Sequence, residues 1–119
     1  MNIGKVIYYT TVNGVNPVKD FINSLSPNQR SKIFRIFSLI EQYGIYSVPT
    51  HVKKLTGTLF WEIRILGKDN VRILYILARR FSALVLNGFI KKSQKTPLKE
   101  IGIAANRYKD WLVRNTVDR

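Results

Sequence analysis

Residues 59–90 read LFWEIRILGKDNVRILYILARRFSALVLNGFI and contain three apolar runs, each about as long as a β-strand. The runs are residues 59–66, 70–77 and 83–90. They are rich in β-branched and aromatic residues, which favour strands. The short polar segments GKDN (67–70) and RRFS (79–82) separate them and are typical of turns. This stretch therefore predicts a three-stranded antiparallel meander.

The alternation of side chains along these runs predicts what each face of the sheet carries, because successive strand residues point to opposite faces. The first run places Trp61, Ile63 and Ile65 on one face, and Phe60, Glu62 and Arg64 on the other. The second run places Val71, Ile73, Tyr75 and Leu77 opposite Arg72. The third run is apolar on both faces, as expected of a central strand or one covered twice.

Helices are predicted on both sides of the meander. Asn16 and Pro17 supply a cap and a first helical residue, which predicts a short helix over about residues 17–24. Ser26 and Gln29 have the spacing of a capping box, and the helix that they begin is expected to end at Gly44. Residues 48–51 are expected to be loop. After the meander, Thr96 and Pro97 open a last helix whose apolar stripe is Ile101, Ala105, Tyr108 and Leu112.

A strand over residues 6–9 completes the order: strand, helix, helix, three strands, helix. That order predicts a single α+β domain over residues 1–119. An N-terminal strand and a helical hairpin would pack on an antiparallel sheet, followed by a C-terminal helix. Residues 115–119 are expected to form a frayed tail.

The charge of the chain points to a polyanionic partner. Twenty lysines and arginines against seven acidic residues give a net charge of +13. The excess is uneven, with five basic and two acidic residues in 1–52 against fifteen and five in 53–119. A field of this sign attracts nucleic acid, because neutralised phosphates release their counterions. A basic surface that serves only solubility is the alternative.

Several kinds of site are disfavoured by what the sequence lacks. Without cysteine, neither disulfides nor thiolate metal ligands form, and a lone histidine, His51, excludes an all-histidine metal cage. Seven acidic residues argue against a two-metal nuclease, and there is no glycine-rich phosphate loop. We therefore expect no metal and no cofactor. No apolar run is long enough to span a bilayer and no secretory signal is visible, so the expected compartment is the cytoplasm.

Three basic segments could converge on one face of the predicted sheet. They are Lys53-Lys54 before the meander, the pair Arg64 and Arg72, and Lys91-Lys92 with Lys95 after the last strand. Arg64 and Arg72 are nearly symmetric about the turn between their strands, so both could reach the same phosphate. This convergence would distinguish a binding site from a solvated surface.

Most of these residues also have an ordinary structural explanation, which is weaker for Arg72 because it interrupts an otherwise apolar run. Lys53 and Lys54 could be solvated loop residues, and Arg64 could pair with Glu62 on the sheet surface. The lysines after the last strand could be charged gatekeepers that oppose aggregation.

Aromatic side chains and the histidine are weaker candidates. Phe60 or Trp61 could stack on bases, although a strand tryptophan is more often core. His51 could act as an acid or base, but a lone loop histidine is more often simply exposed. Tyr108 and Trp111 are expected to serve packing.

These parts suit RNA cleavage without a metal, because the 2′-hydroxyl of RNA is a built-in nucleophile. Such cleavage needs a base for that hydroxyl, neutralisation of the phosphate charge and a proton for the leaving 5′-oxygen. Arginines clamp phosphate with two hydrogen bonds, and a lysine crowded by other cations can serve as the base.

The segment KKLTGTLFWEIR (53–64), the step RILY (72–75) and the segment GFIKKSQKTP (88–97) resemble the RelE/ParE toxin superfamily. The resemblance is greater to its phage-derived Gp49-like or HigB-like branch and covers essentially the whole chain. It implies the toxin of a type II toxin–antitoxin system, which cuts mRNA on the ribosome and is silenced by a helix-turn-helix antitoxin.

By position, the resemblance assigns RNA binding and cleavage to five basic residues: Lys54, Arg64, Arg72, Lys91 and Lys92. Lys53 and Lys95 would assist, and Phe89 and His51 are further candidates for RNA contact. Some relatives carry a tyrosine or histidine near the start of the last helix, where this chain has Lys99, Glu100 and Ile101. The residues that move protons therefore stay open, with His51 or a ribosomal group as candidates.

Two other functions stay open beside the mRNA endonuclease. One is a ParE-like inhibitor of DNA gyrase that cuts no nucleic acid, since one fold hosts both activities. The other is a relative that binds RNA without cutting it. The cationic face favours an RNA partner but does not separate cutting from binding.

Overall fold

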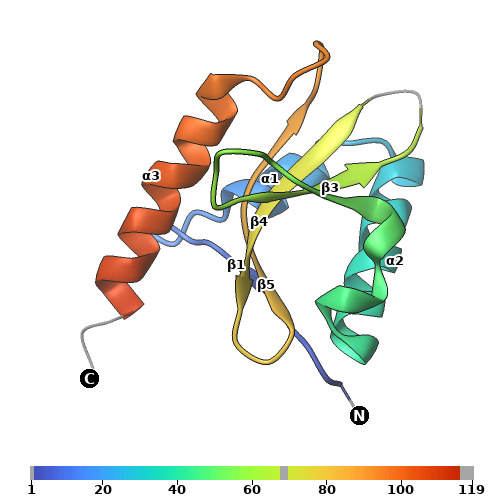
Figure 1. Cartoon of the computed structure of the whole chain (residues 1–119), viewed down its shortest axis with the longest axis horizontal. Helices are drawn as coiled ribbons and strands as arrows, with labels where there is room; N and C mark the ends of the chain where they lie inside the picture. Colours follow the sequence, from blue (N-terminus) through green and yellow to red (C-terminus); the bar gives the residue numbers. More distant parts are fainter. Residues whose placement is uncertain (1, 68–69, 116–119) are drawn as a thin grey trace.

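The computed structural model describes residues 2–67 and 70–115, and its sheet lies between α3 on one face and α1 and α2 on the other (Figure 1). The helices are α1 (Pro17–Asn23), α2 (Pro27–Tyr43) and α3 (Leu98–Asn115), and the strands are β1 (Val6–Tyr8), β2 (Val52–Lys54), β3 (Trp61–Ile65), β4 (Val71–Ala78) and β5 (Ser82–Ile90). Asn115 ends α3, and the rest of the expected frayed tail lies outside the described residues.

The sheet has five strands in the order β1-β5-β4-β3-β2. The predicted meander of β3, β4 and β5 is confirmed and is antiparallel throughout. Two features differ from the expectation. First, β1 pairs with β5 in parallel, which makes the sheet mixed. Second, residues 52–54 pair with β3 as a short edge strand. Lysines on so short an edge are a common defence against pairing with another chain.

The first two helices begin where the capping residues predict. The Asn16 side chain accepts a hydrogen bond from the Lys19 backbone N–H at 3.1 Å. The Ser26 hydroxyl accepts one from the Gln29 backbone N–H at 3.3 Å. The expected loop over 48–51 contains a short 3₁₀ turn, Pro49–His51, which leads directly into β2.

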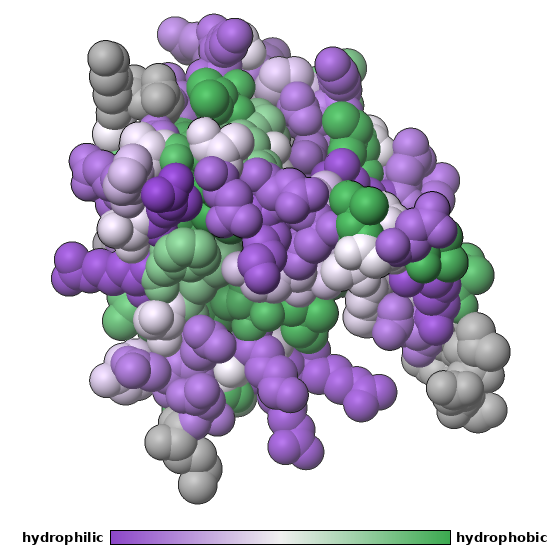
Figure 2. Space-filling model, turned by 180° about the vertical axis from the view of Figure 1, so that it is seen from behind, coloured by the Kyte–Doolittle hydropathy of each residue, from purple (hydrophilic) through white to green (hydrophobic). Residues whose placement is uncertain are grey.

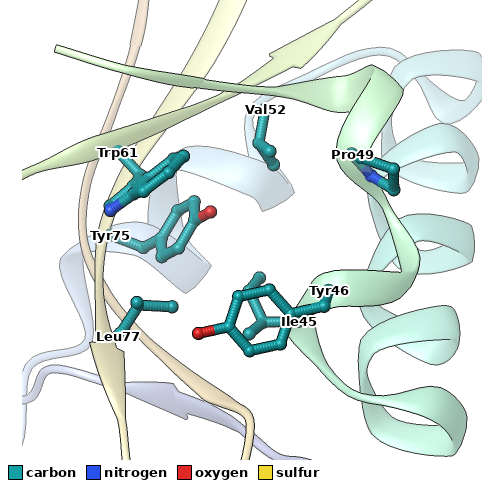
Figure 3. A pocket seen from close by; sticks show the side chains of 7 residues that line it. All are labelled: Ile45, Tyr46, Pro49, Val52, Trp61, Tyr75 and Leu77. Atoms are coloured by element: carbon teal, nitrogen blue, oxygen red, sulfur yellow. The ribbon is translucent and has the colours of Figure 1, made fainter.

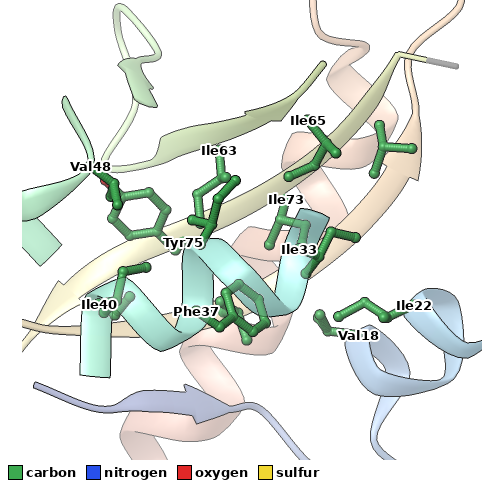
Figure 4. Packing of buried hydrophobic residues seen from close by; sticks show 14 of the residues in the cluster. Val18, Ile22, Ile33, Phe37, Ile40, Val48, Ile63, Ile65, Ile73 and Tyr75 are labelled. Atoms are coloured by element: carbon green, nitrogen blue, oxygen red, sulfur yellow. The ribbon is translucent and has the colours of Figure 1, made fainter. Parts of the chain in front are cut away.

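Two hydrophobic cores lie on the two faces of the sheet, as the alternation in the sequence predicts. In the first core Ile33, Phe37 and Ile40 of α2 point toward Ile63 and Ile73 of the strands (Figure 4). The second core lies under α3, and its buried members are Tyr9, Phe60, Leu74, Leu84, Leu86, Phe89 and Ala104. Both faces of β5 are buried, so the strand that is apolar on both sides is indeed covered twice.

Polar contacts fix α3 on the sheet at two points. The buried Asn87 amide of β5 donates to the Glu100 carboxylate at 2.9 Å. Further along the helix, the Tyr9 hydroxyl donates to Asp110 at 2.6 Å, and this bond raises the pKa of Tyr9. The Arg114 guanidinium also bonds Asp110 and holds the pKa of that carboxyl below its usual range. These contacts leave the start of α3 beside the loop that follows β5.

The hairpin between β4 and β5 is held against the end of α2. Arg80 and Phe81 occupy the left-handed region, with φ of 54° and 61°, which is unfavourable for side chains of this size. The Phe81 carbonyl accepts a hydrogen bond from the Ile45 backbone N–H at 2.8 Å, and its ring meets Tyr46 edge-on at 5.9 Å. These contacts compensate for the strained turn.

At Gly44 this packing leaves no room for a side chain. Its φ is +89°, and an added Cβ would lie 2.9 Å from the Phe81 Cβ. We expect Gly44→Ala to lower the free energy of unfolding by about 3 kcal/mol, because backbone strain and overpacking add. Urea denaturation measures the change.

Gly14 provides the matched control, since its φ is +86° and nothing lies within 4 Å of an added Cβ. Gly14→Ala should therefore cost about 1 kcal/mol, from backbone strain alone. Equal losses in the two variants would show that the hairpin does not press on α2.

Candidate nucleic-acid interface

The face of the sheet that α3 covers is closed over β5 but open toward β3 and β2. The strand register places two rows of residues across this face. One row runs from Lys53 through Glu62 and Leu74 to Asn87, and the other runs from Arg64 through Arg72 to Phe89. Leu74 and Phe89 are buried under α3, whereas Arg64 and Lys53 are exposed. The open part of the face is therefore the cationic part.

Arg64 and Arg72 are directly opposed on neighbouring strands. Like charges at such positions repel, which destabilises the sheet unless an anion lies between them. Within residues 2–67 and 70–115, Arg64 makes no ion pair or hydrogen bond and projects into solvent. The sequence placed these two arginines on one face correctly.

Arg72, rather than Arg64, pairs with the acid of β3. Its Nε donates to Glu62 Oε1 at 3.2 Å, and its Nη1 donates to the Val71 carbonyl at 3.1 Å. The Arg72 side chain is 13% exposed and that of Glu62 only 1%. The other carboxylate oxygen of Glu62 accepts a hydrogen bond from the Thr96 hydroxyl. The guanidinium is thereby held in one orientation at the edge of the open face.

Two neighbouring hollows bring the basic segments together. The first, of about 450 Å³, is lined by Asn70, Arg72, Lys91, Lys92, Ser93 and Gln94. The second, of about 360 Å³, is lined by Lys53, Lys54, Leu55, Thr56, Thr58, Glu62, Lys91, Gln94, Lys95, Thr96 and Ile101. Lys91 and Gln94 line both hollows. Cations from β2, β4 and the loop after β5 thus line two adjoining hollows, which together we call the lysine basin.

The two lysines of β2 enter the lysine basin differently. Lys53 is the register partner of Glu62 and shares its face of the sheet. Lys54 is the partner of Trp61, and its amino group bonds the carbonyls of Leu55 and Thr58 in the following loop. Both residues are exposed, so both ammonium groups can meet an anion.

Three sequence candidates lie elsewhere. Phe89 is 6% exposed within the core under α3, so its ring is not accessible to a base. His51 lines a cavity formed mainly by α2 residues such as Lys32 and Arg35, away from the lysine basin. Trp61 packs on the first core and stacks on Tyr75 with a centroid distance of 6.5 Å, as expected of a core tryptophan.

An apolar pocket of about 260 Å³ lies between β3, β4 and the segment after α2 (Figure 3). It is lined by Ile45, Tyr46, Pro49, Val52, Trp61, Tyr75 and Leu77. Burial raises the pKa of the Tyr75 hydroxyl.

Seen from behind, hydrophilic side chains cover much of the surface and leave hydrophobic patches between them (Figure 2). Hydrophilic surface alone therefore does not mark the site, and the convergence of cations does.

The sequence reasoning did not include Glu62, Thr96 or Gln94 among the functional residues. Glu62 carried a usable signal, because it shares the parity of Arg64 and Phe60 and so points to the cationic face. The sequence places Thr96 before the last helix and within the segment 88–97, and neither position predicts a contact with Glu62. Its contact with Glu62 joins residues 34 positions apart and leaves no local pattern.

Within the part of the chain that the structure describes, no three histidine, cysteine or acidic side chains group closely enough to hold a metal ion. In the same ranges, no helix is both long and apolar enough to cross a membrane.

A family model described as "Phage derived protein Gp49-like (DUF891)" matches residues 20–109. The match includes the second helix, the strands from β2 to β5 and most of α3, and therefore the whole of the lysine basin. A comparison with curated proteins finds no match.

Proposed function

The chain belongs to the phage-derived Gp49-like family, which is consistent with the RelE/ParE-like toxin branch that its sequence resembles, and we propose that it is the toxin of a type II toxin–antitoxin system. The proposed activity is endonucleolytic cleavage of mRNA without a metal ion. One observation carries the proposal: the lysine basin collects Arg72, Lys91, Lys92, Lys53 and Lys54 from three separate segments.

In the proposed reaction the arginines hold the scissile phosphate. Arg72 presents a guanidinium that is already oriented by Glu62, and Arg64 is free to close on the phosphate from the opposed strand. Pre-oriented donors stabilise charge that develops on the phosphate oxygens without a cost of reorganisation during the reaction. The planar fork of arginine suits two phosphate oxygens at once.

A lysine among Lys54, Lys91 and Lys92 takes the proton of the 2′-hydroxyl. The 2′-oxygen then bonds to phosphorus while the bond from phosphorus to the 5′-oxygen breaks, and the 5′-oxygen receives a proton from another, protonated lysine of the basin or from a ribosomal group. The products are a 2′,3′-cyclic phosphate and a 5′-hydroxyl. Of these lysines, Lys91 has the most central position because it lines both hollows of the basin.

The proposal also includes partners and a compartment. The substrate is mRNA held on the ribosome, the cognate antitoxin carries a helix-turn-helix, and the toxin acts in the cytoplasm. A net charge of +13, most of it in residues 53–119, supports an RNA substrate, because contacts between cations and phosphates release counterions.

The test is an assay of mRNA cleavage by primer extension with purified protein, with and without ribosomes. We expect discrete cuts that end in a 5′-hydroxyl, and any cuts made in RNA without ribosomes should persist in the presence of a chelator. Message that stays intact under both conditions would contradict the nuclease. DNA breaks that depend on gyrase in cells would instead support a ParE-like inhibitor, and salt-dependent RNA binding without cuts would support a non-catalytic relative.

A further inference from the structure

Glu62 is a buried carboxylate on the open part of the face, where the charged neighbours that line its hollow are lysines. Its side chain is 1% exposed, and Lys53, Lys54, Lys91 and Lys95 line the same hollow. Burying a carboxylate is costly unless it is paired and hydrogen-bonded. An acid at this position also weakens the attraction of the basin for RNA. Its presence therefore needs an explanation other than substrate affinity.

The contacts of Glu62 define the orientation of Arg72. Oε1 accepts from the Arg72 Nε at 3.2 Å, and the Val71 carbonyl accepts from Nη1 at 3.1 Å. Among the described residues Nη2 has no protein partner, so this edge of the guanidinium stays available beside the first hollow. The bonds from Nε and Nη1 thus fix the guanidinium plane and leave the Nη2 amino group free to donate to an anion.

The second oxygen of Glu62 reaches the segment that carries the lysines. Oε2 accepts from the hydroxyl of Thr96, which lies between Lys95 and the start of α3. The lysines of this segment, Lys91 and Lys92, line the same hollow as Arg72. One carboxylate therefore sets the position of Arg72 relative to the lysine segment.

We infer that Glu62 is a positioning residue for RNA cleavage. It binds Arg72 directly and the lysine segment through Thr96, and so fixes their positions relative to each other. The inference rests on the proposed function and deepens it. It assigns to Glu62 a contribution to the chemical step that is separate from RNA binding.

The inference predicts effects of opposite sign on binding and on cleavage. Removing the carboxylate charge makes the basin more positive, so RNA should bind as tightly as before or more tightly. The chemical step should slow, because a small misplacement of a phosphate-binding group costs up to about 100-fold in rate. A variant that is merely misfolded would lose both properties together.

The experiment compares Glu62→Gln with the unaltered protein in single-turnover cleavage of a message on which that protein is active. Binding is measured with an RNA that carries a 2′-deoxy nucleotide at the cut. We expect a fall of about 10- to 100-fold in the cleavage rate and an unchanged or lower Kd. Glu41→Gln, an equal change of charge at an exposed position on α2, should leave the rate unchanged. Equal cleavage rates in the unaltered protein and Glu62→Gln would overturn the inference.

Thr96 gives a second variant that leaves the charge of the basin unaltered. Thr96→Val removes the hydroxyl that binds Glu62, and we expect a loss of about tenfold in the cleavage rate. Thr96→Ser keeps the hydroxyl and should restore the rate. Equal rates in the valine and serine variants would overturn the role of this contact.

The signal of the Arg72 Nε–H group in a ¹H–¹⁵N spectrum separates failure of the inference from failure of the proposed function. It should be protected from exchange in the unaltered protein and lose protection in Glu62→Ala. If the unaltered protein cuts no RNA, the proposed function fails. The protection of this signal and the affinity for RNA still test whether Glu62 positions Arg72. Equal protection in both proteins would overturn it.

Discussion

Arg72→Lys should slow RNA cleavage by about 100-fold while the protein stays folded, because lysine keeps the charge but not the planar fork. Arg72 is held by Glu62 and by the Val71 carbonyl, and a lysine ammonium cannot meet both and still present two donors to a phosphate. The loss should appear mainly in the single-turnover rate. Quenched-flow or manual sampling of end-labelled RNA measures it.

Arg79→Lys provides the matched control, since Arg79 is exposed at the β4–β5 hairpin and lines neither hollow of the lysine basin. It should cut at the unaltered rate. Thermal unfolding of the two variants should agree to within about 1 kcal/mol in stability, because Arg72→Lys leaves a cation beside Glu62. Cleavage at the unaltered rate by Arg72→Lys would show that this guanidinium does not hold the scissile phosphate.

The second large effect should come from one arginine substitution among Lys54→Arg, Lys91→Arg and Lys92→Arg. Arginine keeps a phosphate contact but does not give up its proton, so it cannot act as a base. The variant in which the lysine that acts as the base is replaced should lose at least about 100-fold in the cleavage rate, in line with the usual contribution of general-base catalysis. The other two should keep most of their activity.

Binding to the RNA with a 2′-deoxy nucleotide at the cut should be nearly equal in all three variants, since each keeps its charge. Lys19→Arg, at an exposed position on α1, is the control for the substitution itself. If all three basin variants cut at the unaltered rate, the base is not one of these lysines. A ribosomal group would then be the next candidate, since His51 lines a different cavity.

Local sequence patterns predicted most of the fold. The caps at Asn16 and Ser26, the end of α2 at Gly44 and the alternation along residues 59–66 each act through neighbours in the chain. Such signals are visible in a sequence because the contacts that they describe span only a few positions. The three basic segments were identified for the same reason, since composition and parity are local properties.

The edges of the sheet were harder to predict. Residues 52–54 form a strand only because β3 offers a free edge, and the two lysines in this segment give little strand preference of their own. The parallel pairing of β1 with β5 joins residues more than 70 positions apart. The position of Phe89 near the lysines made it a candidate for RNA contact, and only the packing of α3 shows that its ring is buried.

The sequence by itself determined the three main helices, the meander with its two faces and the cationic character of one face, because capping, strand alternation and charge follow from residue order. Only the tertiary structure decided which side chains meet. It paired Glu62 with Arg72 and Thr96, placed Lys91 between the two hollows and put His51 at a separate cavity. Contacts between distant segments depend on how strands, loops and α3 pack together, and no local pattern encodes that packing.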